Sequence, residues 1–240
     1  MQMINTGING ADSAKLTEFV ALLNEVAVPE YFSKIELEDN LTDSSGGYAL
    51  VKFYVDNALF LELRENKNNI AGTVRIILPN TEYAITGNVN WLGTGLLVTD
   101  RAIAFFYGTI GAGTIGYRCP FIVCKTTDDK TMCMYYGSSS FIAERPQNLT
   151  VSSSSYGIVQ HVAGENAVQG DQYFIPSGST TNSDGVTVAA ALPAMTGHIA
   201  KDVYQALNRS PYTIEYPFLF TQNGESYCGV AFCNYIIKTT

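Results

Sequence analysis

The sequence is short of charged residues, histidine and tryptophan, and each shortage narrows the range of functions. Charged residues make up 15% of the 240 positions and hydrophobic residues 46%, which is too apolar a composition for a disordered chain. The 14 basic residues are outnumbered by 22 acidic ones, so there is no excess of cations to hold a nucleic-acid backbone. Two histidines offer few general bases for nucleophilic catalysis. We expect a folded protein that is not an enzyme and binds no nucleic acid.

Long hydrophobic runs are also lacking. The longest uncharged apolar stretch, residues 102–117, is shorter than the roughly 20 residues of a membrane-spanning helix and contains four glycines. Residues 1–10 have neither the basic region nor the apolar region of a secretory signal. We therefore expect no membrane span and folding in a cytoplasm.

The five cysteines are an odd number, which argues against a complete disulfide framework. In a chain without a signal peptide we expect reduced and mostly buried thiols. The pairs Cys119/Cys124 and Cys228/Cys233 are each spaced by five residues, which places the two sulfurs on opposite faces of a strand. Such sulfurs do not easily share one zinc ion. The sequence predicts no metal and no cofactor.

One segment, residues 13–26, has the period of an amphipathic helix. Its apolar residues are spaced at i, i+3, i+4 and i+7: Leu16, Phe19, Val20 and Leu23. One apolar stripe on a helix must be covered, either by the sheet of its own chain or by a neighbouring subunit. The spacing alone does not choose between these two arrangements.

After this helix the hydrophobic period changes to two. Val51, Phe53 and Val55 alternate with Lys52 and Tyr54, which is typical of a half-buried strand. Thirteen strand-like runs follow one another: 34–38, 47–56, 58–64, 71–78, 82–86, 95–99, 101–107, 120–126, 131–136, 156–162, 171–175, 217–221 and 226–237.

Short strands at this spacing, separated by turn residues, indicate a mainly β protein. A parallel α/β fold would need a helix between successive strands, so we expect an antiparallel β-sandwich or jelly-roll-like fold with one N-terminal amphipathic helix. The clearest hairpins are 121–136 and 218–236, of which the second turns at Asn223-Gly224. A short second helix is expected near 201–208.

The composition changes after Phe141, where residues 144–155 contain Pro146, Asn148 and the serine run 152–155. We place a boundary there. The predicted organisation is an N-terminal helical segment (1–32), a β domain (33–143), and a last part (144–240) that is either a second β domain or a continuation of the same sandwich.

A G-x-G-x-x-G pattern occurs at Gly111–Gly116. In nucleotide-binding proteins this pattern follows a strand and opens a helix that faces the phosphates. Residues 117–125 have no helical period and contain Pro120. A glycine-rich loop or strand edge is the favoured interpretation.

The histidines and paired carboxylates have ordinary structural interpretations as well. His161 and His198 lie in no catalytic signature, so we expect buried or loop histidines with structural partners. The pair at 36 and 38, two glutamates, fits the wet face of a strand, and the aspartates at 128 and 129 fit a hairpin turn. The sequence predicts no catalytic residue.

Tyrosine is abundant, with 15 residues, whereas Trp91 is the only tryptophan. Tyrosine offers a large rigid face and a hydroxyl, which suits contacts with sugars or with neighbouring subunits. We select Trp91, Tyr156 and Tyr173 as candidate glycan or subunit contacts.

Two segments resemble virion structural proteins of bacteriophages and prophages of gut Firmicutes, of the tail, baseplate or fibre type. They are the strand-turn-strand segment Phe121–Met132 and the terminal hairpin Gly224–Lys238. The resemblance implies a homo-oligomeric virion component made in the bacterial host cytoplasm, whose partners are copies of itself, other virion proteins and a host surface. It assigns no functional residue to any position of this chain.

The leading hypothesis is a non-enzymatic phage structural protein of the virion that self-assembles and contacts the host surface. Because the helix at 13–26 stands ahead of an otherwise β chain, we expect it to dock on a neighbouring subunit or to anchor the protein to the particle. The alternative is a carbohydrate-binding module that recognises cell-surface glycan. A third hypothesis, a polysaccharide hydrolase, needs two carboxylates facing each other in a groove.

Overall fold

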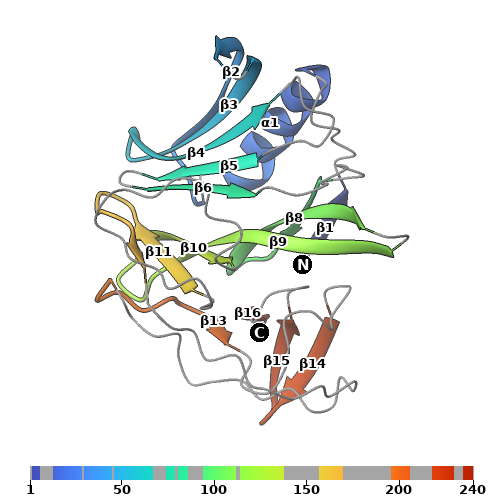
Figure 1. Cartoon of the computed structure of the whole chain (residues 1–240). Helices are drawn as coiled ribbons and strands as arrows, with labels where there is room; N and C mark the ends of the chain where they lie inside the picture. Colours follow the sequence, from blue (N-terminus) through green and yellow to red (C-terminus); the bar gives the residue numbers. More distant parts are fainter. Residues whose placement is uncertain are drawn as a thin grey trace.

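The computed structural model consists mainly of antiparallel strands. It describes residues 2–5, 13–28, 30–44, 46–66, 74–78, 81–85, 94–111, 114–137, 157–169, 196–205, 218–229 and 235–239. Within these ranges the chain forms one helix and three antiparallel sheets (Figure 1). The predicted fold class, mainly β and antiparallel with an N-terminal helix, is confirmed. No helix in the described part has the length and apolar character needed to cross a bilayer.

Helix α1 (Ser13–Ala27) extends one residue beyond its predicted end. Its apolar stripe is buried within the chain, where the four predicted residues join one core with side chains of two sheets: Leu16, Phe19, Val20 and Leu23. The Asn24 amide donates hydrogen bonds to the carbonyl oxygens of Val20 (2.8 Å) and Ile35 (3.1 Å), which ties α1 to the next strand. The chain therefore covers its own helix.

The first sheet has five strands in sequence order: β2 (Lys34–Asp43), β3 (Gly46–Val55), β4 (Ala58–Asn66), β5 (Val74–Leu78) and β6 (Thr81–Ile85). Asp56 and Asn57 form the two-residue turn between β3 and β4, with φ values of 51° and 63°. Positive φ at both positions is the geometry of a type I′ hairpin turn, which Asp and Asn tolerate. Along β3, buried side chains alternate with partly exposed ones, as the sequence predicted.

The second sheet has seven strands in the order β1-β7-β8-β9-β10-β11-β12. Their bounds are β1 (Gln2–Asn5), β7 (Thr94–Val98), β8 (Ala102–Gly111), β9 (Thr114–Lys125), β10 (Thr131–Gly137), β11 (Gly157–Val162) and β12 (Val168–Gln169). Of the G-x-G-x-x-G segment, Gly111 is the last residue of β8 and residues 114–116 begin β9, and Gly111 pairs with Thr114. The described residues after the motif thus form a strand, not the helix of a nucleotide-binding site.

The third sheet has four strands in the order β13-β16-β15-β14: β13 (Val203–Gln205), β14 (Phe218–Gln222), β15 (Glu225–Gly229) and β16 (Tyr235–Lys238). The predicted turn at Asn223-Gly224 connects β14 to β15, with φ values of 52° and 81°. These two values again fit a type I′ turn, for which Asn-Gly is a preferred dipeptide.

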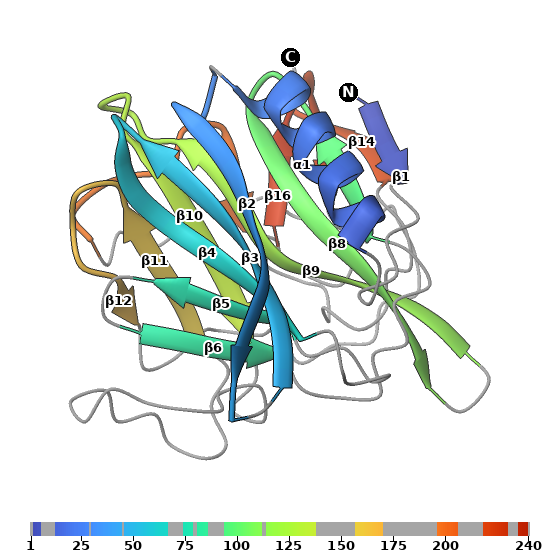
Figure 2. The ribbon, with the colours of Figure 1, turned by 90° about the horizontal axis from the view of Figure 1, so that it is seen from above.

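The three sheets are stacked with the seven-stranded sheet in the middle. In Figure 1 the five-stranded sheet and α1 lie above it, and the four-stranded sheet lies below it. Figure 2 shows α1 running alongside the five-stranded sheet, on the same side of the middle sheet. The middle sheet is therefore covered on both faces.

Alternate residues of the middle sheet fill two different cores. The core shared with α1 and the five-stranded sheet contains Leu96, Ile103, Phe105, Val123 and Cys133. The core shared with the four-stranded sheet contains Leu97, Ala102, Ala104, Ile122, Cys124, Met132 and Met134. Because successive side chains of a strand point to opposite faces, a sheet buried on both faces needs continuous apolar runs. This explains why residues 102–106 and 121–124 are apolar without alternation.

Two secondary-structure predictions are wrong. The second helix expected near 201–208 is instead strand β13, which pairs with β16 through Tyr204 and Ile236. The predicted strand 226–237 is two strands, β15 and β16, which pair with each other. For β13, pairing with a strand about thirty residues away outweighs the local pattern.

The boundary predicted at residue 144 falls between two strands that pair. Gly137 at the end of β10 lies opposite Gly157 at the start of β11, and the register continues to Met132 opposite Val162. Residues after 144 thus complete the middle sheet and also form the third sheet.

Phe53 links two layers and allows the packing to be tested. Its ring is fully buried, 5.0 Å from the ring of Phe32 and 6.0 Å from that of Phe105 on the middle sheet. We expect Phe53→Ala to lower the free energy of unfolding by about 3–5 kcal/mol, because the cavity lies between two layers that cannot easily collapse. Urea unfolding followed by circular dichroism measures this change.

Leu59→Ala is the matched control, because Leu59 is 48% exposed on the neighbouring strand β4. We expect a change within about 0.5 kcal/mol for this variant. Equal losses in the two variants would contradict the packing described.

Candidate functional site

The predicted contact residues Trp91, Tyr156 and Tyr173 lie outside the described residues. Their role as glycan or subunit contacts stays a prediction. The four helix residues that were predicted to contact a neighbouring subunit lie in the core of the chain. The exposed fractions of Leu16, Phe19, Val20 and Leu23 are 2%, 5%, 9% and 0%. The apolar face of α1 is thus not free for a partner, because the chain's own sheets cover it.

His161 is a buried residue of the upper core. Its Nε2 lies 2.8 Å from the carbonyl oxygen of Phe60, and its ring stacks on the Phe60 ring at 4.6 Å. Its Nδ1 has no hydrogen-bond partner within the described structure. Burial lowers the pKa of His161, so the ring is neutral and Nε2–H is the donor to Phe60. The expectation of a structural histidine fits this environment.

The cysteines that can be described are inert thiols. Cys124, Cys133 and Cys228 are free and buried, as the sequence predicted. Burial raises the pKa of Cys124 to about 12, so its nucleophilic thiolate form is not populated near neutral pH. No three described His, Cys, Asp or Glu side chains are grouped in a way that would hold a metal ion.

The turn between β9 and β10 organises the polar end of the middle sheet. Thr126 closes the turn: its main-chain NH donates to the Lys130 carbonyl at 2.9 Å, and its Oγ1 accepts from the Lys130 NH at 2.9 Å. Asp129 has a φ of 64°, which Asp adopts more readily than most residues. Asp128 and Asp129 therefore lie at the tip of a hairpin, where the sequence placed them.

The segment 196–202 is bonded along this hairpin. The main-chain NH of Thr127 donates to the Ile199 carbonyl (2.9 Å), and the NH of Lys201 donates to the Lys125 carbonyl (2.8 Å). Thr126 and Ala200 form an isolated β-bridge. These bonds hold the start of the third sheet against the end of the middle sheet.

His198, from this segment, lies between two carboxylates. Its Nδ1 is 3.1 Å from Asp128 Oδ2 and its Nε2 is 2.9 Å from Glu165 Oε1, while Lys130 Nζ contacts the same Glu165 oxygen at 2.8 Å. Hydrogen bonds to Asp128, which has the larger effect, and to Glu165 raise the pKa of His198. The protonated ring can donate to both carboxylates at once. This arrangement is an ion-pair network that braces the hairpin tip.

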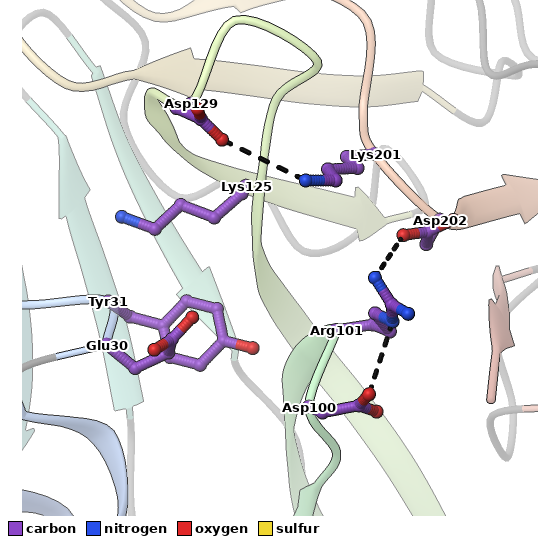
Figure 3. A pocket seen from close by; sticks show the side chains of 8 residues that line it. All are labelled: Glu30, Tyr31, Asp100, Arg101, Lys125, Asp129, Lys201 and Asp202. Atoms are coloured by element: carbon purple, nitrogen blue, oxygen red, sulfur yellow. Dashed lines mark hydrogen bonds and ion pairs between the residues drawn. The ribbon is translucent and has the colours of Figure 1, made fainter. Parts of the chain in front are cut away.

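A cavity of about 310 Å³ opens beside the same hairpin, at the point where the three layers meet (Figure 3). Its basic residues are Arg101, Lys125 and Lys201. Its acidic residues are Glu30, Asp100, Asp129 and Asp202, and its remaining wall is Tyr31. We call this cavity the junction pocket. Its lining comes from the end of α1, the β7–β8 turn, the β9–β10 hairpin and the start of β13.

Most charges of the junction pocket are paired inside it. Arg101 Nη1 lies 3.1 Å from Asp202 Oδ2, and Arg101 Nε lies 3.3 Å from Asp100 Oδ2. Lys201 Nζ and Asp129 Oδ1 are 3.9 Å apart. Lys125 instead donates to the hydroxyl of Thr131 at 3.0 Å. Acids and bases thus alternate around the wall rather than occupying separate sides (Figure 3).

Two buried polar atoms of the junction pocket are left without a hydrogen bond among the described residues. They are the hydroxyl of Tyr31 and the Nε of Arg101, whose 3.3 Å contact with Asp100 is an ion pair without hydrogen-bond geometry. Tyr31 is only 2% exposed, and its hydroxyl points toward the Arg101 side of the pocket in Figure 3. Burial raises the pKa of Tyr31, so the phenol is neutral and has a proton to donate. Buried polar atoms normally have partners, so these two are candidates for binding a ligand.

Comparisons with known proteins found no match: no protein-family model, no curated protein and no solved structure matches the chain.

Sequence reasoning did not find the junction pocket. Its residues lie between positions 30 and 202, and no period or motif joins them. The one available signal is the placement of charged residues directly after apolar strands, as with Asp100-Arg101 after β7 and Lys125 at the end of β9. Strand ends usually carry polar residues for reasons of solvation, so this signal alone does not identify a site.

The two histidines should titrate in opposite directions from the ordinary value of about 6.5. We expect the ring of His198 to titrate above this value, because two carboxylates favour its charged form, and that of His161 below it, because burial favours the neutral form. Histidine ring resonances followed by NMR from pH 5 to 9 test this prediction, and His198→Gln assigns the two signals.

The same variant tests the linkage to stability. A raised pKa stabilises the fold fully below the unfolded pKa, and this contribution is lost as the pH rises through the folded pKa. The melting temperature of the unaltered protein should therefore fall relative to that of His198→Gln as the pH rises above about 6.5. Parallel curves for the two proteins would show that the network around His198 does not form in solution.

Proposed function

We propose that this chain is a non-enzymatic structural protein of a bacteriophage particle, of the tail, baseplate or fibre, that assembles with copies of itself. The resemblance of Phe121–Met132 and Gly224–Lys238 to such proteins supports the choice of particle. In the described fold the first segment is the β9–β10 hairpin and the second runs from the β14–β15 turn through β16. Both contribute to the body of the sandwich.

The observation that carries self-assembly is the place of β14, which is the last strand of the third sheet among the described residues. Strand β14 is the last in the order β13-β16-β15-β14, and its sequence, Phe-Leu-Phe-Thr-Gln, contains no charge and no proline. Leu219, its second residue, is 64% exposed. Strand β14 pairs with β15 in continuous register over all five of its residues. A regular, uncharged edge with an exposed leucine is a template for another strand.

The corresponding edge of the first sheet is protected. Strand β2 exposes Glu36 and Glu38, which pair with Lys34 (2.9 Å) and Lys52 (2.5 Å). Its register with β3 is irregular between Glu38 and Leu41. Charges and an irregular register both prevent edge-to-edge pairing. Of these two edges, β14 is the one suited to a second copy.

Addition of a second copy at β14 would extend the four-stranded sheet across a twofold axis. In an antiparallel pair of identical edge strands, each Leu219 meets the same surface of the partner, which gives a closed dimer interface. Other particle proteins would then bind elsewhere on the body.

The second candidate function is recognition of a glycan on the host surface. The junction pocket favours it, because the pocket combines hydrogen-bond donors and acceptors around a small cavity. A structural protein of a particle that also binds glycan would satisfy both proposals.

Leu219→Lys tests self-assembly through β14. A charge on this edge strand should oppose pairing of two copies, because both lysines would lie at the new interface and charged residues on an edge disfavour strand addition. We expect the weight-average mass from light scattering to rise with concentration for the unaltered protein. The same measurement on Leu219→Lys should show mainly the 26.1 kDa monomer.

Leu59→Lys provides the control, since Leu59 is an exposed leucine on a different sheet. This variant should assemble like the unaltered protein. A monomer at every concentration for the unaltered protein, or equal assembly of both lysine variants, would contradict the proposed use of β14.

A further inference from the structure

The junction pocket is not used by pairing at β14, and its chemistry narrows the ligand that it would accept. Three basic and four acidic side chains line it, a formal sum of −1. A phosphate or another multiply charged anion would face four carboxylates, and a cation would face Arg101, Lys125 and Lys201. Neither sign of charge suits the lining as a whole.

A zwitterion would need acids on one side and bases on the other. The pocket instead alternates them: Arg101 lies between Asp100 and Asp202, and Lys201 lies beside Asp129 (Figure 3). Alternating donors and acceptors suit groups that both donate and accept hydrogen bonds. Hydroxyl groups do this, and neighbouring hydroxyls on a ring present the two roles a short distance apart.

The donors left without a hydrogen bond agree with a hydroxylated ligand. The Tyr31 hydroxyl has a proton and no partner among the described residues, and Arg101 Nε has only the ion pair with Asp100. Lys125 is bonded to one neutral hydroxyl, that of Thr131, and has further protons to donate. An oxygen acceptor placed near these donors would satisfy them, and exposed Glu30 at the rim would accept from a second hydroxyl.

The size of the cavity limits the ligand to a small unit. Its 310 Å³ lies at the lower end of the range of about 300–1,000 Å³ found for ligand pockets. Asp129, whose side chain is 85% exposed, marks the open side, where a longer chain would continue into solvent.

We propose that the junction pocket binds one uncharged sugar unit of a glycan, with Tyr31, Arg101 and Lys125 as hydrogen-bond donors and Glu30 and Asp100 as acceptors. This assignment rests on the second candidate function, recognition of glycan, and not on self-assembly. It places the contact at residues other than the predicted Trp91, Tyr156 and Tyr173.

Titration of the full chain with single sugars tests the assignment. The probes are D-glucose, D-galactose, N-acetyl-D-glucosamine and N-acetyl-D-galactosamine, with D-glucuronate, glycine and inorganic phosphate for comparison. Binding is followed by amide chemical shifts in NMR. We expect at least one neutral sugar to bind, with shifts at the β9–β10 hairpin and the segment 196–202.

Tyr31→Phe removes the hydroxyl without a partner and keeps the ring. Because this hydroxyl makes no bond in the free protein, the melting temperature should stay the same or rise, whereas the dissociation constant for the sugar should increase about threefold to tenfold. Arg101→Lys keeps the charge but lacks Nε, and should weaken binding similarly. Tyr48→Phe removes a phenol hydroxyl from the first sheet, outside the pocket, and should bind normally.

Each other outcome overturns the assignment in a distinguishable way. If neutral sugars bind Tyr31→Phe and Arg101→Lys as tightly as they bind the unaltered protein, the junction pocket is not the binding site, although the protein still recognises glycan. Binding of only glycine, glucuronate or phosphate that depends on Tyr31 would replace the ligand class. No binding of any probe would reject both the pocket and glycan recognition, while light scattering on the β14 variants would still decide self-assembly.

Discussion

Burial of the middle sheet on both faces is the constraint on which the rest of the structure depends. Each of its central strands must supply apolar side chains to two cores, so that Ile103 and Phe105 face α1 and the first sheet while Ala102 and Ala104 face the third sheet. The first and third sheets need one apolar face each. Their outer faces can carry charged and aromatic residues. On β2, for example, Glu36 and Glu38 form ion pairs there.

The same constraint places the polar chemistry at the ends of the strands. A charged side chain in the doubly covered part of the middle sheet would be buried without water, and the buried runs 102–105 and 122–124 contain none. Charged residues flank these runs where β7 and β9 end, at Asp100-Arg101 and Lys125. The layers above and below approach these ends, with Tyr31 following α1 and Asp202 preceding β13. The junction pocket is thus a consequence of three layers meeting at the polar edge of a sheet that is apolar on both faces.

Ion pairs and hydrogen bonds hold the tip of the β9–β10 hairpin at this edge of the middle sheet. Asp128 and Asp129 are adjacent in sequence, yet Asp128 binds His198 on one side and Asp129 lies near Lys201 on the other. Main-chain hydrogen bonds donated by Thr127 and Lys201 hold residues 199–201 against the hairpin. One wall of the pocket is therefore positioned by a network of backbone hydrogen bonds and ion pairs.

The sequence by itself determined the local elements of this protein. The period of 3.6 residues from Leu16 to Leu23 predicted α1, the alternation around Phe53 predicted a half-buried strand, and Asn223-Gly224 predicted a hairpin turn, because each pattern reflects backbone geometry over a few residues. Only the tertiary structure decided that the apolar face of α1 is covered by its own chain, that residues 203–205 form a strand, and that Tyr31, Arg101 and Lys201 share a cavity. These features depend on contacts between segments far apart in the chain, and no short-range period records which segments will meet.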